Sequence, residues 1–288
     1  MDLILYNPLS KNSKSNIQTH KLVQEYKKSN IPFRLKSILK IDDIRLYLED
    51  KSHIDNVILL GGDGTINRFV NNIIDYDLKQ DIYLKSNGSG NDFLRSLKTN
   101  DELPQHIMKV VYDTGKTTHF VNGVGIGLDG LVAQIVDSQE KKGKLRYMWC
   151  TIKGMFKFIP EPATVIADGK EYKYDKVYIV AVNNGKYFGG GMQITPDANI
   201  SDENLDVIIV HTISKLFILP IFFTIYVGLH TKFTKYVTNF KAKHVEAIFT
   251  TPQISETDGE SHYDVTSMKV ESSQKLLHLR CYDNKKSA

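Results

Sequence analysis

Three glycines follow an apolar segment near residue 60, with a carboxylate before the third glycine and a hydroxyl directly after it. Residues 56–60 are a short β-rich run, and residues 66–74 place apolar side chains at helical spacing. The glycine stretch, Gly61 to Thr65, therefore lies at a predicted strand-to-helix turn. There, backbone N–H groups can approach a phosphate, the helix N-terminus favours negative charge, and Asp63 can hold magnesium or its waters. A plain tight turn has the same composition, so both interpretations stay open for this stretch alone.

A second loop of small and polar residues follows the next predicted strand, at 82–86, and precedes a short helical pattern at 93–97. Its residues are Gly88, Ser89, Gly90, Asn91 and Asp92. In an open parallel sheet, loops at the carboxyl ends of neighbouring strands meet in one crevice. Two such loops with carboxylates beside them predict a site for a nucleoside triphosphate and its metal. The spacing fits neither a Walker A loop nor the dinucleotide fingerprint.

The pattern of elements changes near residue 120. Before it, strand-like segments alternate with helical ones, which predicts an α/β sheet. After it, strand-like segments predominate, at 118–124, 164–167, 177–182, 205–211, 244–250 and 267–282, with helical patterns at 131–142 and 145–158. Asp168-Gly169 between two strand-like runs predicts a hairpin turn. The second half is therefore predicted to be an antiparallel β-sandwich with helical insertions.

Composition is that of an ordinary globular enzyme. The 288 residues suffice for two domains, and 41% of them are hydrophobic and 24% charged. Cys150 and Cys281 are too few for a disulfide framework, which favours a reducing cytoplasm. The sequence opens on a predicted strand without a signal-peptide pattern, so secretion is not expected. No stripe of basic and aromatic residues indicates nucleic-acid binding.

The longest apolar run covers residues 216–229. It is shorter than the roughly 20 residues that span a bilayer, and Pro220 interrupts it, so no transmembrane segment is predicted. The run could be a buried core helix or an interfacial helix that touches lipid. Lysines flank it, and with the net charge of +4 they favour weak attraction to an anionic surface. They are Lys215, Lys232, Lys235, Lys241 and Lys243.

Further motifs occur in order along nearly the whole chain. They lie at 3–8, 61–65, 88–93, 122–129, 183–185, 189–191, 196–198 and 257–260. Together they resemble the diacylglycerol kinase catalytic domain family, in the soluble bacterial lipid kinase branch that includes sphingosine-kinase-like relatives. Lys11, Arg68 and Glu203 depart from the family's usual pattern, and none of them removes a carboxylate of the core motifs.

The resemblance implies two domains with the active site in the cleft between them. Residues 1–119 would bind the nucleotide, residues 120–279 would form the lipid-substrate sandwich, and a last strand near 280–288 would return to the first domain. The residues implied in binding ATP are Asn7, Gly61, Gly62, Asp63, Gly64, Thr65, Asn67, Gly88, Ser89, Gly90, Asn91 and Asp92. By the same resemblance, Asp63, Asp92 and Asp129 organise the catalytic magnesium and its waters. Each could instead cap a helix.

Glu260 is the candidate general base, because the family's proton acceptor is the glutamate of its Asp-Gly-Glu motif. Asp258 and Glu260 flank a glycine that could aim both carboxylates at one point, although an exposed acidic hairpin turn would look the same. A second magnesium site is implied at Asn199, Asp202 and Asn204, with a solvated loop as the alternative.

The expected activity is that of an ATP-dependent lipid kinase. It would transfer the γ-phosphoryl group to the free hydroxyl of diacylglycerol or a similar membrane lipid, giving phosphatidic acid or an analogue. An NAD kinase-type enzyme shares the Gly-Gly-Asp-Gly-Thr motif, and a non-catalytic nucleotide-binding regulatory protein could keep the fold. The expected setting is cytoplasmic, peripheral at an anionic inner membrane surface, with ATP and Mg²⁺ as cofactors, no nucleic-acid partner, and a homodimer as one oligomeric state.

Overall fold

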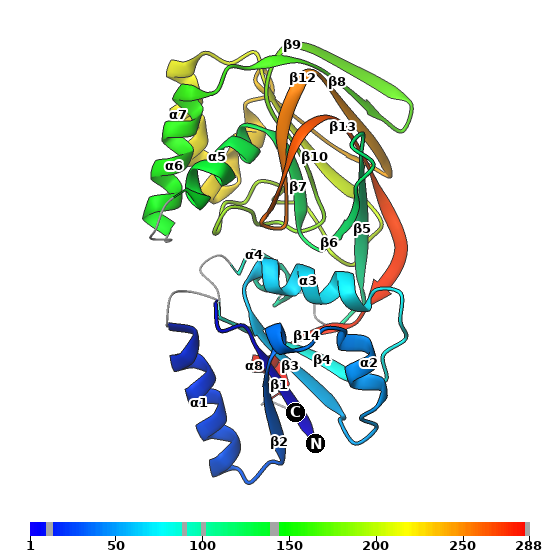
Figure 1. Ribbon diagram of the computed structural model, residues 1–288. Helices are drawn as coiled ribbons and strands as arrows, with labels where there is room; N and C mark the ends of the chain where they lie inside the picture. The colour runs from blue at the N-terminus through cyan, green and yellow to red at the C-terminus, as the bar shows by residue number, and fades with distance from the viewer. Residues whose placement is uncertain (10–13, 88–90, 99–101, 139–143, 286–288) are drawn as a thin grey trace.

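The computed structural model describes residues 1–9, 14–87, 91–98, 102–138 and 144–285. Two bodies are stacked end to end (Figure 1). The N-terminal body is a parallel sheet flanked by helices, and the C-terminal body is built mainly of antiparallel strands with a layer of helices on one side. This confirms the predicted fold class.

The N-terminal sheet has five parallel strands in the order β14-β4-β3-β1-β2. The strands are β1 (Asp2–Tyr6), β2 (Phe33–Ser37), β3 (Asn56–Gly61), β4 (Asp81–Ser86) and β14 (Leu279–Cys281). The helices are α1 (Lys14–Lys28), η1 (Ile38–Lys40), α2 (Ile44–Glu49), α3 (Asp63–Ile73), α4 (Asp92–Leu97) and α8 (Tyr282–Lys285). The edge strand β14 comes from the far end of the chain and pairs with β4.

Alternate residues of the central strands face opposite layers of helices. Leu3 and Leu5 share a core with Phe69 of α3, whereas Ile4 shares another with Leu22 of α1. This period of two, with both faces apolar, is typical of a parallel sheet covered on both sides. It leaves the carboxyl ends of β1, β3 and β4 as the edge from which the loops emerge.

The C-terminal sheet has nine strands, eight of them in the order β11-β10-β9-β7-β12-β13-β5-β6. They are β5 (Gln105–Tyr112), β6 (Thr117–Phe120), β7 (Gly123–Gly127), β8 (Glu161–Ala167), β9 (Lys170–Asn183), β10 (Leu205–His211), β11 (Val237–Ala242), β12 (His244–Thr257) and β13 (Glu260–Leu277). Both β7 and β8 pair with β9 and β12, at opposite ends of those long strands. The sheet thereby folds back on itself around an apolar core.

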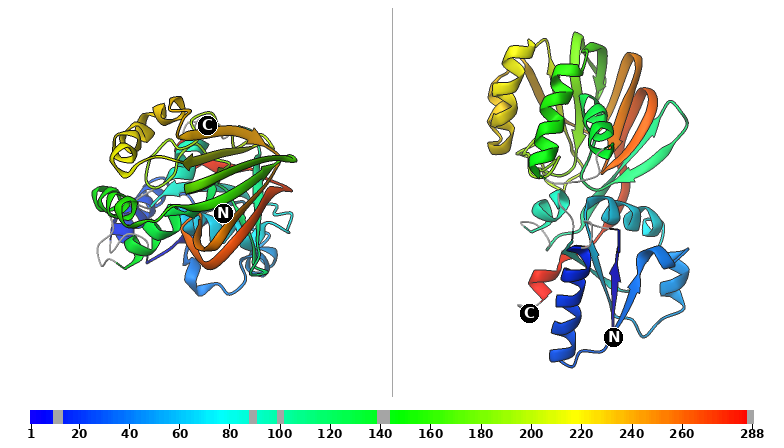
Figure 2. Two further views of the ribbon diagram at one scale, coloured as in Figure 1. Left: turned by 90° about the horizontal axis from the view of Figure 1, so that it is seen from above. Right: turned by 60° about the vertical axis from the view of Figure 1, so that its left-hand side comes forward.

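A layer of helices covers the outer face of β9 and β10 (Figure 2). It consists of α5 (Leu128–Asp137), α6 (Lys144–Lys157), α7 (Lys215–Thr224), η2 (Ile225–Val227) and η3 (Leu229–Lys232). Val132, Met155 and Phe222 from the helices share a second core with Tyr178 and Ile208 from the strands. The helical insertions therefore build their own apolar layer against the sheet.

Two predicted strands are divided in the structure. The stretch 118–124 is split into β6 and β7, because the N–H groups of Val121 and Asn122 donate to the Asp258 carboxylate rather than to a neighbouring strand. The stretch 267–282 is split because β13 belongs to one sheet and β14 to the other. The hairpin turn at Asp168 and Gly169 is confirmed, and both residues have positive φ, 48° and 84°.

The apolar run 216–229 forms α7, η2 and the start of η3. Ile218, Ile221 and Phe222 are buried, so part of the run is a core helix as predicted. Leu216, with 82% of its surface exposed, and Phe217, with 60%, lie on the outside. Among the described residues, no helix combines the length and hydropathy needed to cross a membrane.

Candidate active site

The glycine loop joins β3 to α3 at the carboxyl edge of the parallel sheet. Gly62 precedes the helix in an extended conformation, and Asp63 lies in the first helical turn. The Thr65 hydroxyl accepts a hydrogen bond of 3.0 Å from the Asn7 side chain, which follows β1. A Cβ atom at Gly61 would lie 2.5 Å from the Thr65 side chain, so glycine is needed for this close approach. The loop is thus held tightly between two strand ends.

Asp63 connects the glycine loop to the second loop. Its Oδ1 accepts a hydrogen bond of 3.1 Å from the N–H of Phe93, in the first turn of α4. Asp63 therefore caps a helix, but a different one from its own. Asn91, which precedes α4, adopts the left-handed conformation with φ of 57°. Gly88, Ser89 and Gly90 lie outside the described residues.

Asp92 links the first domain to the second. Its buried carboxylate accepts hydrogen bonds from Arg95 Nη1 at 2.8 Å and from the N–H of Gly190 at 2.6 Å. A Cβ atom at Gly191 would lie 2.5 Å from Arg95 Nη1, so this glycine allows the contact. The glycine segment 189–191 therefore packs on α4 through its backbone, and both Asp92 oxygens already carry donors.

Asp258 is a buried carboxylate surrounded by donors from both domains. Its Oδ2 accepts from Val121 N at 2.7 Å and from Asn67 Nδ2 of α3 at 3.0 Å, while its Oδ1 accepts from Gly123 N at 2.9 Å. Burial raises its pKa to about 6, although the hydrogen bonds act in the opposite direction and lower the pKa. The site of a Cβ atom at Gly64 lies 3.7 Å from the Asp258 carbonyl oxygen. The glycine loop and the Asp258 turn are therefore in contact.

Asp129 lies in the first turn of α5, directly after β7. Gly127 makes the sharp strand-to-helix turn with φ of 102°, and a Cβ atom at Gly125 would collide with the Asp129 carboxylate. Asp129 Oδ2 is buried and has no hydrogen-bond partner among the described residues. Burial raises the pKa of Asp129 to about 7, although a hydrogen bond with the Glu256 side chain lowers it. Asp129, unlike Asp258, therefore has one carboxylate oxygen that accepts no hydrogen bond from the described residues.

Glu256 completes the group, and the sequence analysis missed it. Burial, the charge of Asp129 and the charge of Asp258 raise its pKa well above the ordinary value. The N–H of Gly259 donates to Glu256 Oε1 across the turn. Glu256 lies near the end of β12, two positions before Asp258 in the turn, so its closeness in sequence to the Asp-Gly-Glu motif is the signal that could have found it. The carboxylates of Asp63, Asp258, Glu256 and Asp129 therefore form a row in which, within each neighbouring pair, the charge of one group acts on the other. We call this row the carboxylate file.

Glu260 begins β13 and pairs with Thr257 across the Asp258-Gly259 turn, where both turn residues have positive φ. It is half-buried. Its charge acts on His262, whose pKa is lowered to about 4 by burial and Lys116 in spite of Glu260. The His262 ring packs at a tilt against Tyr112 with 4.7 Å between the ring centres, and the Tyr112 hydroxyl lies 2.5 Å from Thr257 Oγ1. The strand beside Glu260 is therefore firmly anchored.

An apolar cavity of about 60 Å³ lies between the helical layer and the sheet, with Asp129 in its wall. Its other lining side chains are almost all aliphatic or aromatic, including Met155 of α6, Tyr178 of β9 and Phe222 of α7. The carboxylate file therefore meets an apolar interior at Asp129.

The loop 199–204 is closed by its own hydrogen bonds. The Asn199 carbonyl oxygen accepts from Asp202 N at 3.1 Å, and Asp202 Oδ1 accepts from Asn204 N at 2.9 Å. Asn199 Oδ1 accepts from the N–H of Ser201 at 3.1 Å. Two of the oxygens expected to bind magnesium are therefore already engaged.

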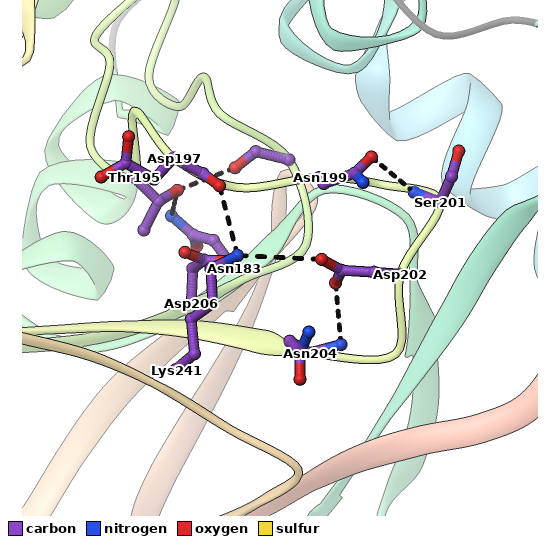
Figure 3. A network of polar contacts seen from close by, with 10 residues as sticks. Asn183, Thr195, Asp197, Asn199, Ser201, Asp202, Asn204, Asp206 and Lys241 are labelled. Atoms are coloured by element: carbon purple, nitrogen blue, oxygen red, sulfur yellow. Dashed lines mark hydrogen bonds and ion pairs between the residues drawn. The ribbon is translucent and has the colours of Figure 1, made fainter.

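A lysine supplies a cation at this loop (Figure 3). Lys241 Nζ lies 3.0 Å from Asp206 Oδ2 and 3.8 Å from Asp202 Oδ2, and it donates to the Asp197 carbonyl oxygen at 3.2 Å. Burial raises the pKa of Asp206 to about 6, although Lys241 lowers it. A magnesium ion bound through Asp202 would compete with this ammonium group, so a metal site here stays a prediction.

The described residues include no group of three or more His, Cys, Asp or Glu side chains that could enclose a metal ion. Magnesium in kinases, however, is held by one or two carboxylates together with the phosphates of the substrate. The orphaned Asp129 oxygen and the partly exposed Asp63 fit that kind of incomplete site better than Asp92 or Asp258, whose oxygens carry donors.

Two family models divide the chain between them. Residues 2–122 match the diacylglycerol kinase catalytic domain, and residues 122–278 match the YegS C-terminal NAD kinase beta sandwich-like domain. The chain belongs to the diacylglycerol kinase catalytic domain family. Within that family it carries the YegS-type second domain, which contributes Asp129, Glu256, Asp258 and Glu260 to the site.

The chain spans about half to two thirds of the length of the curated relatives that it matches. A candidate lipid kinase of Staphylococcus haemolyticus is 32% identical over 55% of this chain and 54% of its own, so the chain spans about half of that relative. A diacylglycerol kinase of Mycobacterium tuberculosis is 26% identical over 67% of each chain. A solved structure described as a candidate diacylglycerol kinase of Bacillus anthracis shares the fold, with a TM-score of 0.71, 23% identity, and coverage of 96% of this chain and 93% of its own.

Proposed function

We propose that the protein is an ATP-dependent lipid kinase that phosphorylates the free hydroxyl of diacylglycerol or a similar membrane lipid. The nucleotide-binding domain would comprise residues 1–119 with the returning β14 strand, and residues 120–278 would receive the lipid. The family membership supports phosphoryl transfer, and the surroundings of Asp129 support a lipid acceptor.

The glycine loop would hold the phosphates of ATP. Backbone N–H groups at the start of α3 carry partial positive charge and have no intrahelical partners, which suits an anion. Asn7 and Thr65 fix the loop, and Asn67 fixes α3 to Asp258. When bound with ATP, magnesium would neutralise phosphate charge, and Asp63 and Asp129 would organise the ion and its waters.

Glu260 would act as general base. Its carboxylate would take the proton of the lipid hydroxyl while that oxygen forms a bond to the γ-phosphorus and the bond to the bridging oxygen breaks, releasing ADP. Asp258 would act as a positioning residue, because its hydrogen bonds to Val121, Gly123 and Asn67 fix the turn before Glu260 against α3.

The observation that carries the lipid assignment is the double environment of Asp129. One side of this residue faces an apolar cavity, and the other side adjoins Glu256, which neighbours Asp258. A substrate with an apolar body and one reactive hydroxyl suits such a junction, whereas a dinucleotide would bring polar groups to an apolar wall that cannot satisfy them.

The test is phosphorylation of a panel of acceptors by radiolabelled ATP in mixed micelles. The panel contains diacylglycerol, phosphatidylglycerol, a sphingoid base and NAD. We expect label in one or more lipid alcohols, dependent on magnesium. If NAD alone is labelled, the protein is an NAD kinase and not a lipid kinase. If the protein binds ATP but neither hydrolyses it nor transfers phosphate to any acceptor, it is a regulatory protein.

A further inference from the structure

Large apolar side chains gather on the outer surface of the helical layer. Helices α6 and α7 lie against each other (Figures 1 and 2). Lys215 Nζ of α7 donates to the Phe156 carbonyl oxygen of α6 at 2.8 Å. We define the outer face as the exposed large apolar residues described in α6, α7 and η2, which are Trp149, Phe156, Leu216, Phe217, Phe223 and Val227. Trp149, the only tryptophan of the chain, has 69% of its surface exposed. Clustered exposure of this kind marks an interaction surface.

The two chain segments that carry the outer face are basic. Residues 148–160 and 212–245 contain no aspartate or glutamate. Within these segments, exposed lysines lie at Lys153, Lys157, Lys215, Lys232 and Lys235. An apolar surface with a fringe of lysines matches the boundary between acyl chains and anionic headgroups. A second copy of this chain placed face to face would bring the same lysines together, which disfavours a two-fold dimer here.

The inner surface of the same helices lines the cavity that reaches Asp129. Ile218 and Phe222 of α7 and Met155 of α6 are among the lining residues. The cavity volume of about 60 Å³ is far below the roughly 300–1,000 Å³ of ligand pockets, so an acyl chain could enter only if α6 and α7 moved apart. Pro220 lies inside α7 and cannot donate to the Leu216 carbonyl oxygen, which weakens the helix at that point.

We propose that the outer face docks on an anionic bilayer, with α6 and α7 in the interface, and that the lipid substrate passes between these helices toward Asp129. The second half of this proposal rests on the proposed function, whereas the docking itself does not. Docking in this orientation would let the apolar part of the substrate move from the bilayer to the cavity without crossing water.

The single tryptophan gives a direct test with the unmodified protein. Vesicles of phosphatidylcholine with phosphatidylglycerol should shift Trp149 emission to the blue, and acyl chains labelled with bromine should quench it. The shift should shrink at high salt and with pure phosphatidylcholine, because screening or loss of the anionic lipid removes the attraction. Co-sedimentation with the vesicles without a change in emission would overturn the proposal. A blue shift that depends on protein concentration, without vesicles, would identify a second copy as the occupant.

Variants separate docking from chemistry. Leu216→Ser combined with Phe217→Ser should weaken vesicle binding at least about tenfold, because two apolar side chains no longer leave water. Leu46→Ser, at a half-exposed position on α2 in the other domain, is the matched control and should bind vesicles as the wild type does. Equal binding by the double variant and the wild type would contradict the docking surface.

Short-chain diacylglycerol dispersed without vesicles distinguishes this proposal from the proposed function. The double variant should lose phosphorylation of vesicle-borne substrate but keep that of the short-chain lipid. If Trp149 enters vesicles and no lipid alcohol is phosphorylated in any form, the docking surface stands and the kinase assignment fails. If lipid is phosphorylated while Trp149 emission ignores vesicles, the kinase assignment stands and the docking surface fails.

Discussion

Asp258 and Asp129 are both buried carboxylates at the junction of the two domains, and their surroundings differ. Asp258 accepts hydrogen bonds from three backbone N–H groups and from Asn67, so its oxygens are fully used. Asp129 Oδ2 has no hydrogen-bond partner among the described residues, and Asp129 lines an apolar cavity. Burial raises the pKa of both groups. The comparison teaches that burial alone does not identify a reactive group, because a carboxylate must also keep an acceptor free.

Of the variants that test this comparison, Asp129→Asn should have the largest effect on turnover. The amide keeps the shape but removes the charge, so the rate should fall by roughly 10²-fold or more. The melting temperature should stay level or rise, because a poorly solvated charge leaves a buried position. Asp206→Asn is the matched control, since Asp206 is also buried with a raised pKa but pairs with Lys241. A control that loses as much turnover, or an active Asp129→Asn enzyme, would break the comparison.

Asp258→Asn should lower the stability of the fold more than it lowers turnover. The amide has one acceptor oxygen and a donor that faces N–H groups, so buried donors lose their partner at about 1–3 kcal/mol each. Thermal unfolding should show a drop of several degrees. Asp168→Asn tests the specificity of this loss, because Asp168 also accepts backbone N–H groups, from Lys243 and His244, but at an exposed hairpin. Equal losses in both variants would mean that Asp258 does no more than an ordinary turn residue.

Glu256→Gln should produce the smallest effect, visible in how stability depends on pH. In the folded protein the pKa values of Asp129 and Glu256 are raised, so between about pH 4 and 7 the folded state binds more protons than the unfolded chain. Wild-type stability therefore contains a component that falls as pH rises through this window. Glutamine removes one of the two titrations, so the variant should lose less stability between pH 5 and pH 8.

Melting temperatures of both proteins at pH 5 and pH 8 check this prediction. His262, whose pKa is lowered to about 4, contributes with the opposite sign, but it is present in both proteins and cancels in the difference. Identical pH profiles would contradict the raised pKa of Glu256 in the folded protein.

Much of the fold could be predicted because local patterns are strong. The β1, β3 and β4 strands are short apolar runs, and each ends at a glycine or polar loop that begins a helix. The division of 118–124 could not be predicted, because its cause is a carboxylate 137 residues away from Val121. Likewise, β13 and β14 read as one strand in the sequence, since nothing local indicates that Leu279 pairs with a different sheet.

The candidate site was only partly accessible from the sequence. The order of the motifs indicated that one site contains Asp63, Asp92, Asp129, Asp258 and Glu260. A motif does not show which of their carboxylate oxygens already accept hydrogen bonds. Gly190 contacts Asp92, and Lys241 lies at the Asp202 loop, through contacts between residues far apart in the chain. The roles of these residues in nucleotide and metal binding stay predictions.

The central claim is that lipid phosphorylation depends on Glu260 as general base, and Glu260→Gln tests it most directly. We expect nucleotide affinity and melting temperature close to those of the wild type, with the turnover rate lower by about two to four orders of magnitude, because glutamine cannot accept the proton. Both should be measured on one preparation, by nucleotide titration and by a radiolabelled-ATP assay with lipid. Normal turnover would contradict the account, and lost nucleotide binding with an unchanged maximal rate would make Glu260 a ligand for metal or nucleotide instead.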